Sequence, residues 1–163
     1  MKEDVVSAVL ALALRNCTKE EFLNRVGVAD GSKLSYELLV EARNGHDADG
    51  VEIGLIVGFT FGFRPEHFSL LVELANATWH YKHEDIVTAI GEFKNPEAVG
   101  VLVQNALNIP EYLSFDLSRA LAVKAIWALG SIPGKLGASA LRQLCLDESP
   151  IVRDSAAQQL RAR

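Results

Sequence analysis

Residues 147–160 read DESPIVRDSAAQQL, and residues 116–129, which lie 31 positions earlier, read DLSRALAVKAIWAL. Both stretches begin with an aspartate, carry apolar or small side chains at helical spacing and end on a leucine, Leu129 or Leu160. A third copy lies 39 positions before the middle one, where residues 86–91 match 125–130. Short helices that recur in this way cannot each bury an apolar stripe alone, so the repeat predicts that they stack on their neighbours.

The helices that lie between these copies repeat as well. Residues 102–107 match residues 141–146 at the offset of 39, so each unit is predicted to hold two short antiparallel helices. The offset exceeds 31 because eight extra residues fall in 109–116, which predicts a longer loop there. We therefore predict an all-α fold, an α-solenoid of stacked antiparallel helix pairs in one domain over 1–163. Residues 64–163 hold the recognisable repeats, and residues 1–63 hold degenerate or capping helices.

Start and stop signals place the individual helices. Thr18 and Glu21 have the spacing of a capping box, Gly27 suits the end of that helix, and Ser32 suits the start of the next. From residue 64 onward, prolines and capping residues predict helices over about 65–77, 83–93, 95–108, 118–131, 135–146 and 151–161, with Asp116 or Ser118 opening the fourth of these.

Residues 51–63 admit two interpretations. Apolar side chains alternate along them, as in a strand. Glycines recur every four residues, at Gly50, Gly54, Gly58 and Gly62, and on a helix they would form a groove for a neighbouring backbone. We favour the helix, because no second convincing strand exists to pair with. Whether that groove is used for packing or is a binding edge stays open.

Composition excludes several classes of protein. The chain is 49% apolar and 23% charged, with a net charge of -5 and a pI of about 5.4, which argues against a disordered chain and against a general nucleic-acid binder. Cys17 and Cys145 cannot make a disulfide framework. We expect a cytoplasmic protein without membrane contact, because no signal-peptide pattern opens the sequence and its longest apolar stretch, 51–63, is too short to span a bilayer.

The stretch 147–160 resembles the second-helix signature of HEAT repeats, particularly the short type also found in phycobilisome lyases. The resemblance implies that Asp147 caps this helix, that Val152, Ala156 and Leu160 face the core, and that Arg153 pairs with an aspartate of a neighbouring repeat. Residues 116–129 resemble the same segment, with Ala122 where the signature has arginine. HEAT arrays are mostly binding scaffolds, so the resemblance implies protein binding rather than catalysis.

Candidate chemistry is sparse. His80 and His83, with Glu84, Asp85 and His67 nearby in sequence, are the best candidates for a metal site. However, residues 79–82 fall in a predicted inter-helix turn, so His80 and His83 would not share a helix face, and no third ligand has diagnostic spacing. Neither cysteine has a histidine positioned for nucleophilic catalysis, and no Gly-x-Ser-x-Gly elbow occurs. We therefore predict no catalytic residue, no metal and no cofactor.

Charge is unevenly distributed along the chain. Residues 1–111 hold 17 acidic and nine basic side chains, a net charge of -8, whereas residues 112–163 have a net charge of +3 with Arg161 and Arg163 in a predicted frayed tail. An acidic repeat surface favours a basic protein partner. Aromatic and charged positions on the second helices and their loops form the predicted binding set: Trp79, Tyr81, Glu84, Thr88, Glu92, Tyr112, Phe115, Lys124, Trp127, Asp154 and Gln158.

Trp127 is the strongest candidate for partner contact in this set. Its counterpart in the last repeat is Gln158, which suggests that the core does not need a large ring at this position. A second interpretation, that Trp127 fills a gap between repeats, stays open.

A small acidic HEAT protein also resembles the immunity proteins of bacterial polymorphic toxin systems. This resemblance implies a monomer that binds and neutralises a basic, nuclease-type toxin domain. The alternatives are a general scaffold or adaptor and a lyase-type chromophore-handling enzyme. A DNA-repair glycosylase on HEAT-like repeats would need a basic groove for phosphates, which the acidic charge does not favour.

Overall fold

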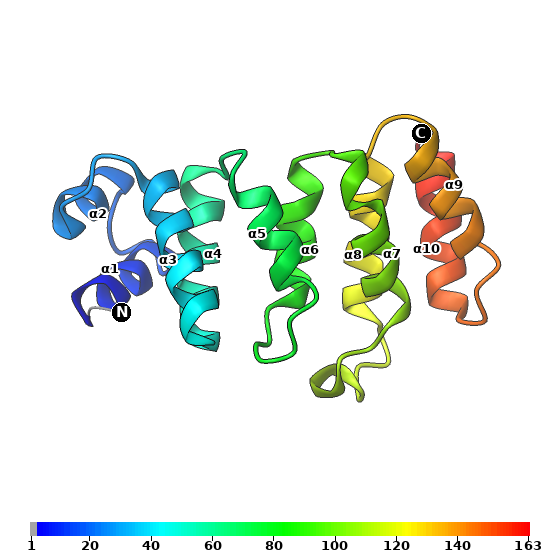
Figure 1. Cartoon of the computed structure of the whole chain (residues 1–163), viewed down its shortest axis with the longest axis horizontal. Helices are drawn as coiled ribbons and strands as arrows, with labels where there is room; N and C mark the ends of the chain where they lie inside the picture. Colours follow the sequence, from blue (N-terminus) through cyan, green and yellow to red (C-terminus); the bar gives the residue numbers. More distant parts are fainter. Residues whose placement is uncertain (1–2) are drawn as a thin grey trace. The chain divides into compact units, whose positions relative to one another are not determined.

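The chain is all-helical over the residues that the structure, a computed structural model, describes, which are residues 3–163 (Figure 1). It divides into two compact units, one ending at Leu70 and one running from Leu71 to Arg163. No helix within 3–163 is long and apolar enough to cross a bilayer.

The first unit contains α1 (Glu3–Ala13), α2 (Lys19–Val26), α3 (Gly31–Gly45), α4 (Ala48–Phe61) and the start of α5 (His67–Leu74). Its core is an apolar cluster drawn from α1 to α4, with members such as Val9, Phe22 and Leu38. The capping box of α2 is confirmed: Glu21 N–H donates to Thr18 Oγ1 over 3.2 Å, and Thr18 N–H donates to Glu21 Oε2 over 2.7 Å. The bonds that the Glu21 carboxylate accepts from Thr18 N–H and from the Thr18 hydroxyl lower the pKa of this carboxyl. Gly27 ends α2 at a φ of 70°.

The helical interpretation of residues 51–63 is confirmed, because α4 extends to Phe61 and packs along α3. Its glycines bring the two helices together: a Cβ on Gly54 would lie 2.7 Å from Leu39 Cγ and 3.2 Å from Leu39 N. The predicted cap at Ser32 is wrong. Asp30 caps α3 by accepting from Lys33 N–H over 3.1 Å. Ser32 instead donates to Gly62 O over 2.6 Å, which ties the start of α3 to the end of α4.

The second unit contains the rest of α5, α6 (His83–Glu92), α7 (Val99–Leu107), α8 (Ala120–Ser131), α9 (Lys135–Leu144) and α10 (Pro150–Arg161). Two 3₁₀ turns, η1 (Pro96–Ala98) and η2 (Glu111–Leu113), interrupt the connections before and after α7. Helix α8 contacts α6, α7, α9 and α10, and α7 also contacts α9. Buried side chains such as Ile90, Ile126 and Leu141 form the core between these helices.

Several helix boundaries and capping residues differ from those predicted from the sequence. Helix α5 begins at His67 rather than at Pro65. Asp116 accepts from the Ser118 hydroxyl over 2.6 Å and from Ala120 N–H over 2.8 Å, and these bonds lower the pKa of its carboxyl. Asp116 thus bonds the first amide of α8, but neither it nor Ser118 holds the N-cap position, which Arg119 occupies at a φ of 52°. Asp147 accepts from Ser149 N–H over 2.8 Å, one residue before α10, and Ser149 holds the cap position in its place.

Two arginines near the C-terminus make other contacts than the sequence predicted. Arg153 donates to the backbone carbonyls of Asp147 and Glu148, both over 2.8 Å, instead of pairing with an aspartate of a neighbouring repeat. Arg163 is not frayed, because its guanidinium donates to Ile132 O over 2.7 Å and Gly134 O over 2.9 Å, and it also reaches Leu129 O and Gly130 O. In α10, Val152 and Ala156 are buried as expected, whereas Leu160 is half-buried.

Candidate functional site

Part of the predicted binding set converges on one groove of the second unit. This α6–α8 groove has a volume of about 250 Å³ and is lined from both helices by Thr88, Gly91, Glu92, Lys124, Trp127, Ala128 and Ser131. Four of these seven residues, Thr88, Glu92, Lys124 and Trp127, were expected from sequence.

Small residues set the depth of the α6–α8 groove. A Cβ on Gly91 would lie 2.9 Å from the Cβ of Ala128 and 3.2 Å from its Cα. Ser131 Oγ donates to Gly91 O over 3.1 Å, which joins the ends of α6 and α8 at this point. The two backbones are therefore held close, and the longer side chains on either side form the groove walls.

Trp127 lies on the surface, since its side chain is 55% exposed. Lys124 Nζ lies 2.9 Å from Glu84 Oε2, so the charge of Glu84 is partly neutralised within the unit. Burial raises the pKa of the Glu92 carboxyl, and no cation within 3–163 pairs with it. The groove thus offers an indole face beside an unpaired carboxylate, which suits an apolar side chain and a cation on one partner.

The other predicted residues lie elsewhere. Asp154 and Gln158 are exposed on α10, and Phe115, 78% exposed, lies in the loop between α7 and α8. Trp79 is half-buried with its ring centroid 5.1 Å from that of His80. Tyr81 and Tyr112 come together edge to face with centroids 5.2 Å apart. The eleven residues therefore do not form one continuous site.

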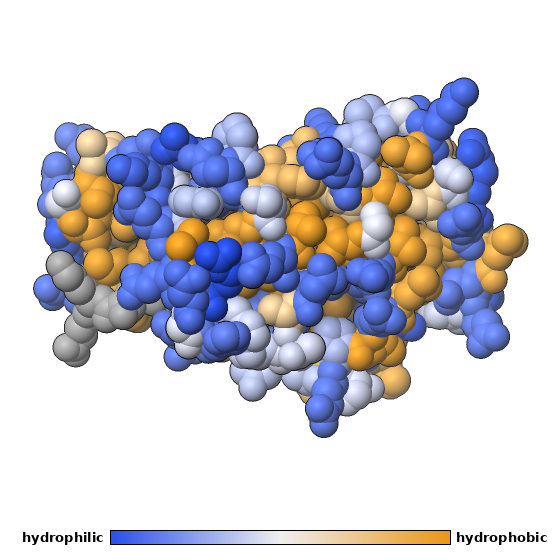
Figure 2. All heavy atoms as spheres, in the orientation of Figure 1, coloured by the Kyte–Doolittle hydropathy of each residue, from blue (hydrophilic) through white to orange (hydrophobic). Residues whose placement is uncertain are grey.

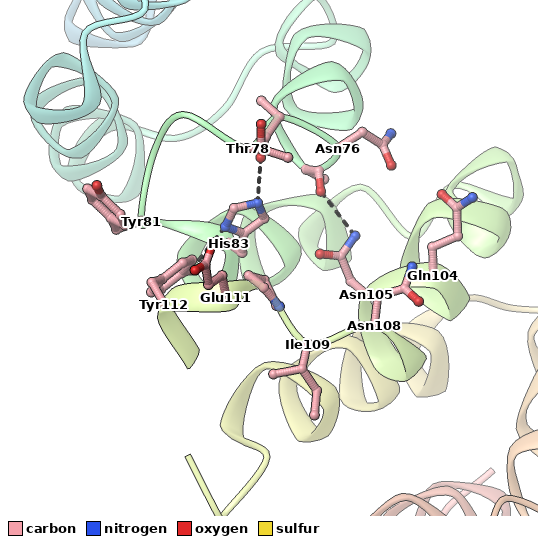
Figure 3. Close-up of a pocket in the computed structure, with 13 residues that line it drawn as sticks. Asn76, Thr78, Tyr81, His83, Gln104, Asn105, Asn108, Ile109, Glu111 and Tyr112 are labelled. Carbon is pink, nitrogen blue, oxygen red and sulfur yellow. Dashed lines mark hydrogen bonds between the residues drawn. The ribbon is translucent and has the colours of Figure 1, made fainter. Parts of the chain in front are cut away.

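A larger pocket, of about 600 Å³, was missed by sequence reasoning apart from Tyr81 and Tyr112. This amide pocket is lined by residues 75–78, Tyr81, His83, 104–105 and 108–112 (Figure 3). The turn after α5, the last turns of α7 and the loop insertion meet there. One sequence signal could have found it: Asn105 stands where the repeat offset of 39 places Leu144, and the inserted loop follows directly.

The two histidines beside this pocket are structural. His80 Nε2–H donates to Leu74 O over 2.8 Å, and its Nδ1 accepts from Lys82 N–H over 3.2 Å. His83 Nε2–H donates to Ala77 O over 2.8 Å, while Tyr112 O–H donates to its Nδ1 over 3.0 Å. Burial lowers the pKa of His80 to about 4 and also lowers the pKa of His83, so both rings are neutral at pH 7.

These ring nitrogens are therefore fully used, and no group of three possible metal ligands exists among residues 3–163. Both cysteines, which are half-buried, are free thiols.

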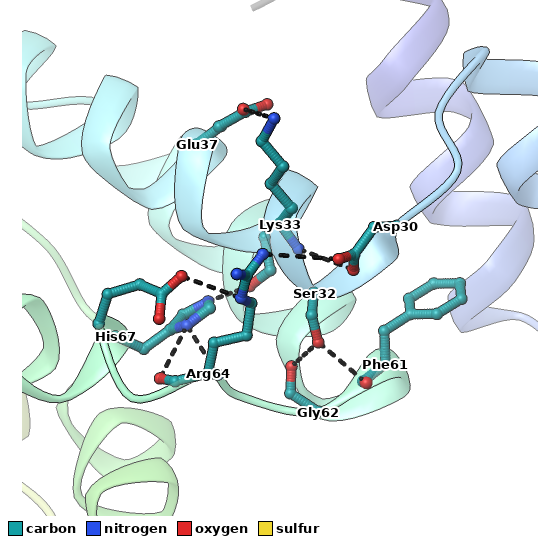
Figure 4. Close-up of polar contacts among 10 residues, drawn as sticks. Asp30, Ser32, Lys33, Glu37, Phe61, Gly62, Arg64 and His67 are labelled. Atoms are coloured by element: carbon teal, nitrogen blue, oxygen red, sulfur yellow. Dashed lines mark hydrogen bonds and ion pairs between the residues drawn. The ribbon is translucent and has the colours of Figure 1, made fainter.

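Ser35 and His67, both buried in the first unit, do not form a nucleophile and base; Figure 4 shows His67 beside the backbone of Arg64. His67 Nδ1 lies 2.9 Å from Arg64 N and 3.2 Å from Arg64 O, so the backbone of Arg64 holds this side of the ring. Ser35 Oγ donates its one proton to Gly54 O over 2.8 Å and lies 3.4 Å from His67 Nε2. The serine proton is therefore directed at a backbone carbonyl rather than at the imidazole, and the contacts of the two side chains join α3, α4 and α5.

No family model, curated protein or solved structure matches the chain.

Proposed function

We propose that this chain is a non-catalytic protein-binding module built as an α-solenoid of HEAT-like helix pairs, which binds a basic protein through the α6–α8 groove. The sequence repeat and the contacts of α8 with both α6 and α10 support the solenoid. The observation that carries the function is the exposed ring of Trp127 beside the unpaired carboxylate of Glu92.

The energetics of the groove favour a partner with both apolar and cationic groups. Tryptophan is the residue most enriched at interface hot spots, where it is surrounded by contacts that exclude water. Partial burial raises the pKa of the Glu92 carboxyl, but the residue is exposed, so a cation of the partner can reach its charge. A lysine or arginine from the partner would stabilise that charge and close over the indole at the same time.

In its most specific form, the proposal is that the chain is a cytoplasmic, monomeric immunity protein that binds and neutralises a basic, nuclease-type toxin domain. The net charge of -8 over residues 1–111 supports such a partner, since a nuclease needs a basic surface for its own substrate. Complementary charge also speeds encounter between two such proteins. A general adaptor with other basic clients is the alternative that the same groove would serve.

The test is capture and neutralisation with a matched variant. The tagged chain is used to recover partners from its native host, and any basic domain with nuclease activity is then assayed with and without the chain. We expect the wild type to suppress that activity. Trp127→Ala combined with Glu92→Gln should weaken binding about 30-fold or more, as expected for loss of a hot spot.

Leu136→Ala, which removes a comparably exposed apolar side chain from α9, is the control and should leave binding unchanged. Equal binding by the Trp127 and Glu92 double variant would contradict the groove assignment. Recovery of basic partners without nuclease activity would support the adaptor and contradict the immunity function.

A further inference from the structure

The amide pocket in the second unit has the features of a ligand site independent of the α6–α8 groove. Its volume of about 600 Å³ lies within the range of small-ligand pockets. Three segments that are separate in sequence contribute to it: the turn after α5, the end of α7 and the inserted 108–112 loop. None of its lining residues belongs to the α6–α8 groove.

Asn105 supplies an acceptor oxygen that the protein leaves unused and that stays open to the pocket. The side chain is only 6% exposed, and its Nδ2 donates to Val101 O over 2.9 Å and to Ala75 O over 3.2 Å. Because both neighbours are carbonyl oxygens, the amide nitrogen must face them, so Oδ1 is directed into the pocket (Figure 3). No protein donor reaches that oxygen within 3–163. No fully buried side-chain oxygen or nitrogen within 3–163 lacks a partner, so this oxygen is reachable through the pocket, where an N–H group of a ligand can donate to it.

The amide of Asn105 departs from the repeat. Leu144 occupies the matching position of the next repeat and is buried there. The Asn105 nitrogen donates to Ala75 O and so joins α7 to the turn after α5, which a leucine could not do, while its oxygen stays available to a ligand.

The electrostatics of the pocket favour a cation. Glu111 is the one lining residue charged at pH 7, because burial lowers the pKa of His83 and keeps its ring neutral. Glu84 and Asp85 lie close enough to Tyr112 to raise the pKa of its phenol, after burial as the larger cause. Arg119 does not line the pocket and donates to Ala106 O over 3.1 Å. Lys82 does not line it either.

Two tyrosine rings complete the site. Tyr81, 63% exposed, meets Tyr112 at 81° with centroids 5.2 Å apart, which makes an aromatic rim. The bond from Tyr112 O–H to His83 Nδ1 holds the Tyr112 ring in place. A planar guanidinium stacks well on such rings and carries several in-plane N–H donors, whereas an ammonium is a compact and strongly hydrated charge.

We propose that the amide pocket binds a guanidinium group, with Asn105 Oδ1 and the Glu111 carboxylate accepting its N–H groups and a tyrosine ring of the rim covering its face. The guanidinium belongs either to a free guanidino compound or to an arginine side chain of a peptide. The proposal does not depend on the function of the α6–α8 groove.

The test is calorimetric titration of the full chain with paired probes. The first pair is n-butylguanidinium and its neutral isostere n-butylurea. The second is Nα-acetyl-arginine N-methylamide and the matching citrulline compound. We expect saturable binding of the guanidinium probes and at least about tenfold weaker binding of the neutral ones, since a lost charge-assisted hydrogen bond is worth about that factor.

Two pocket variants and one control accompany the probes. Asn105→Leu and Glu111→Gln should each weaken guanidinium binding about fivefold or more, and Glu92→Gln in the other groove should not. Tighter binding of the acetyl-arginine amide than of n-butylguanidinium identifies a peptide arginine as the ligand, and the reverse identifies a free compound.

Three outcomes would overturn the proposal. They are no saturable binding up to about 10 mM probe, equal binding of the neutral isosteres, and unchanged binding in Glu111→Gln. Glu111 is exposed, so this last variant stays informative even if Asn105→Leu does not fold.

Discussion

Single side chains close the ends of helices in this protein. The last carbonyls of a helix have no partner within it, and the turn that follows leaves further carbonyls to be satisfied. His80 donates to Leu74 O at the end of α5, His83 donates to Ala77 O in the turn after α5, and Arg153 donates to Asp147 O in the turn after α9, each over 2.8 Å. The His80 ring donates through one nitrogen and accepts a hydrogen bond through the other, which only a neutral imidazole can do. Protonation of the ring breaks the accepted bond, so the stability of the second unit depends on pH.

Acid should destabilise the protein through His80 before most carboxylates titrate. The pKa of His80 is about 4 in the folded chain, against an ordinary value of 6.5. As the pH falls, His80 therefore takes up a proton in the unfolded state before it does so in the folded state, which favours unfolding. The contribution of His80 to the free energy of unfolding is complete above pH 6.5 and is lost as the pH falls from 6.5 toward 4. From pH 7 to 5 we expect a loss of about 2 kcal/mol from this residue, measured by urea denaturation.

The matched variant is His80→Asn, whose free energy of unfolding should change about 2 kcal/mol less over the same pH range. Thr88→Ala, a change at an exposed threonine, should keep the wild-type dependence. Titration of the His80 ring near pH 6.5 in the folded protein, seen by NMR, would contradict the assignment.

At the scale of elements, glycines decide how closely helices pack. Gly54 of α4 faces Leu39 of α3, which is fully buried and cannot move aside. Gly91 of α6 faces Ala128 of α8 in the same way and defines the floor of the α6–α8 groove. Glycine costs a helix roughly 1 kcal/mol relative to alanine, so these positions keep it for the close contact that it permits.

Alanine should have opposite effects at two helical glycines. Gly54→Ala would place a Cβ 2.7 Å from Leu39 Cγ, and we expect it to destabilise the protein by about 2 kcal/mol through overpacking. Gly100→Ala in α7 meets nothing within 4 Å, and we expect it to stabilise by about 0.5 kcal/mol. Urea denaturation of both variants measures this. Similar changes at the two positions would mean that helix propensity, not packing, governs them.

At the scale of the whole molecule, acidic side chains occur along the entire sequence, whereas apolar groups gather over particular helices. The sequence through Leu70 carries 11 acidic and seven basic side chains, and the sequence from Leu71 carries ten and nine. Hydrophobic atoms are prominent on the visible face over α7 and α9 (Figure 2). Long-range attraction of a basic partner therefore draws on acids throughout the chain, whereas close contact in the proposed function depends on Trp127 and Glu92.

Because long-range charge and close contact depend on different residues, we expect salt to change the association rate with the proposed basic partner and Trp127 to change the dissociation rate. Raising the salt concentration from about 20 to 300 mM should slow association about tenfold, because screening removes electrostatic steering. Trp127→Ala should speed dissociation and leave the salt dependence of association unchanged. Surface plasmon resonance measures both rates, and an association rate that is independent of salt would contradict a basic partner.

The sequence by itself determined the features that depend on neighbouring residues. The capping box of Thr18 and Glu21, the stop at Gly27 and the all-helical class follow from local hydrogen bonding and helical periodicity, so they were predicted correctly. The helix over 51–63 was also predicted, because an isolated strand would have had no partner.

Tertiary structure decided everything that needs contacts between distant residues. Arg163 donates to backbone carbonyls that no local pattern marks, at sequence separations of up to 34 residues. The exposure of Trp127 depended on how α6 and α8 approach each other, and the amide pocket on an inserted loop reaching the turn after α5. Periodicity predicts which face of a helix is buried, but the depth of a groove is set by the particular side chains that meet across it.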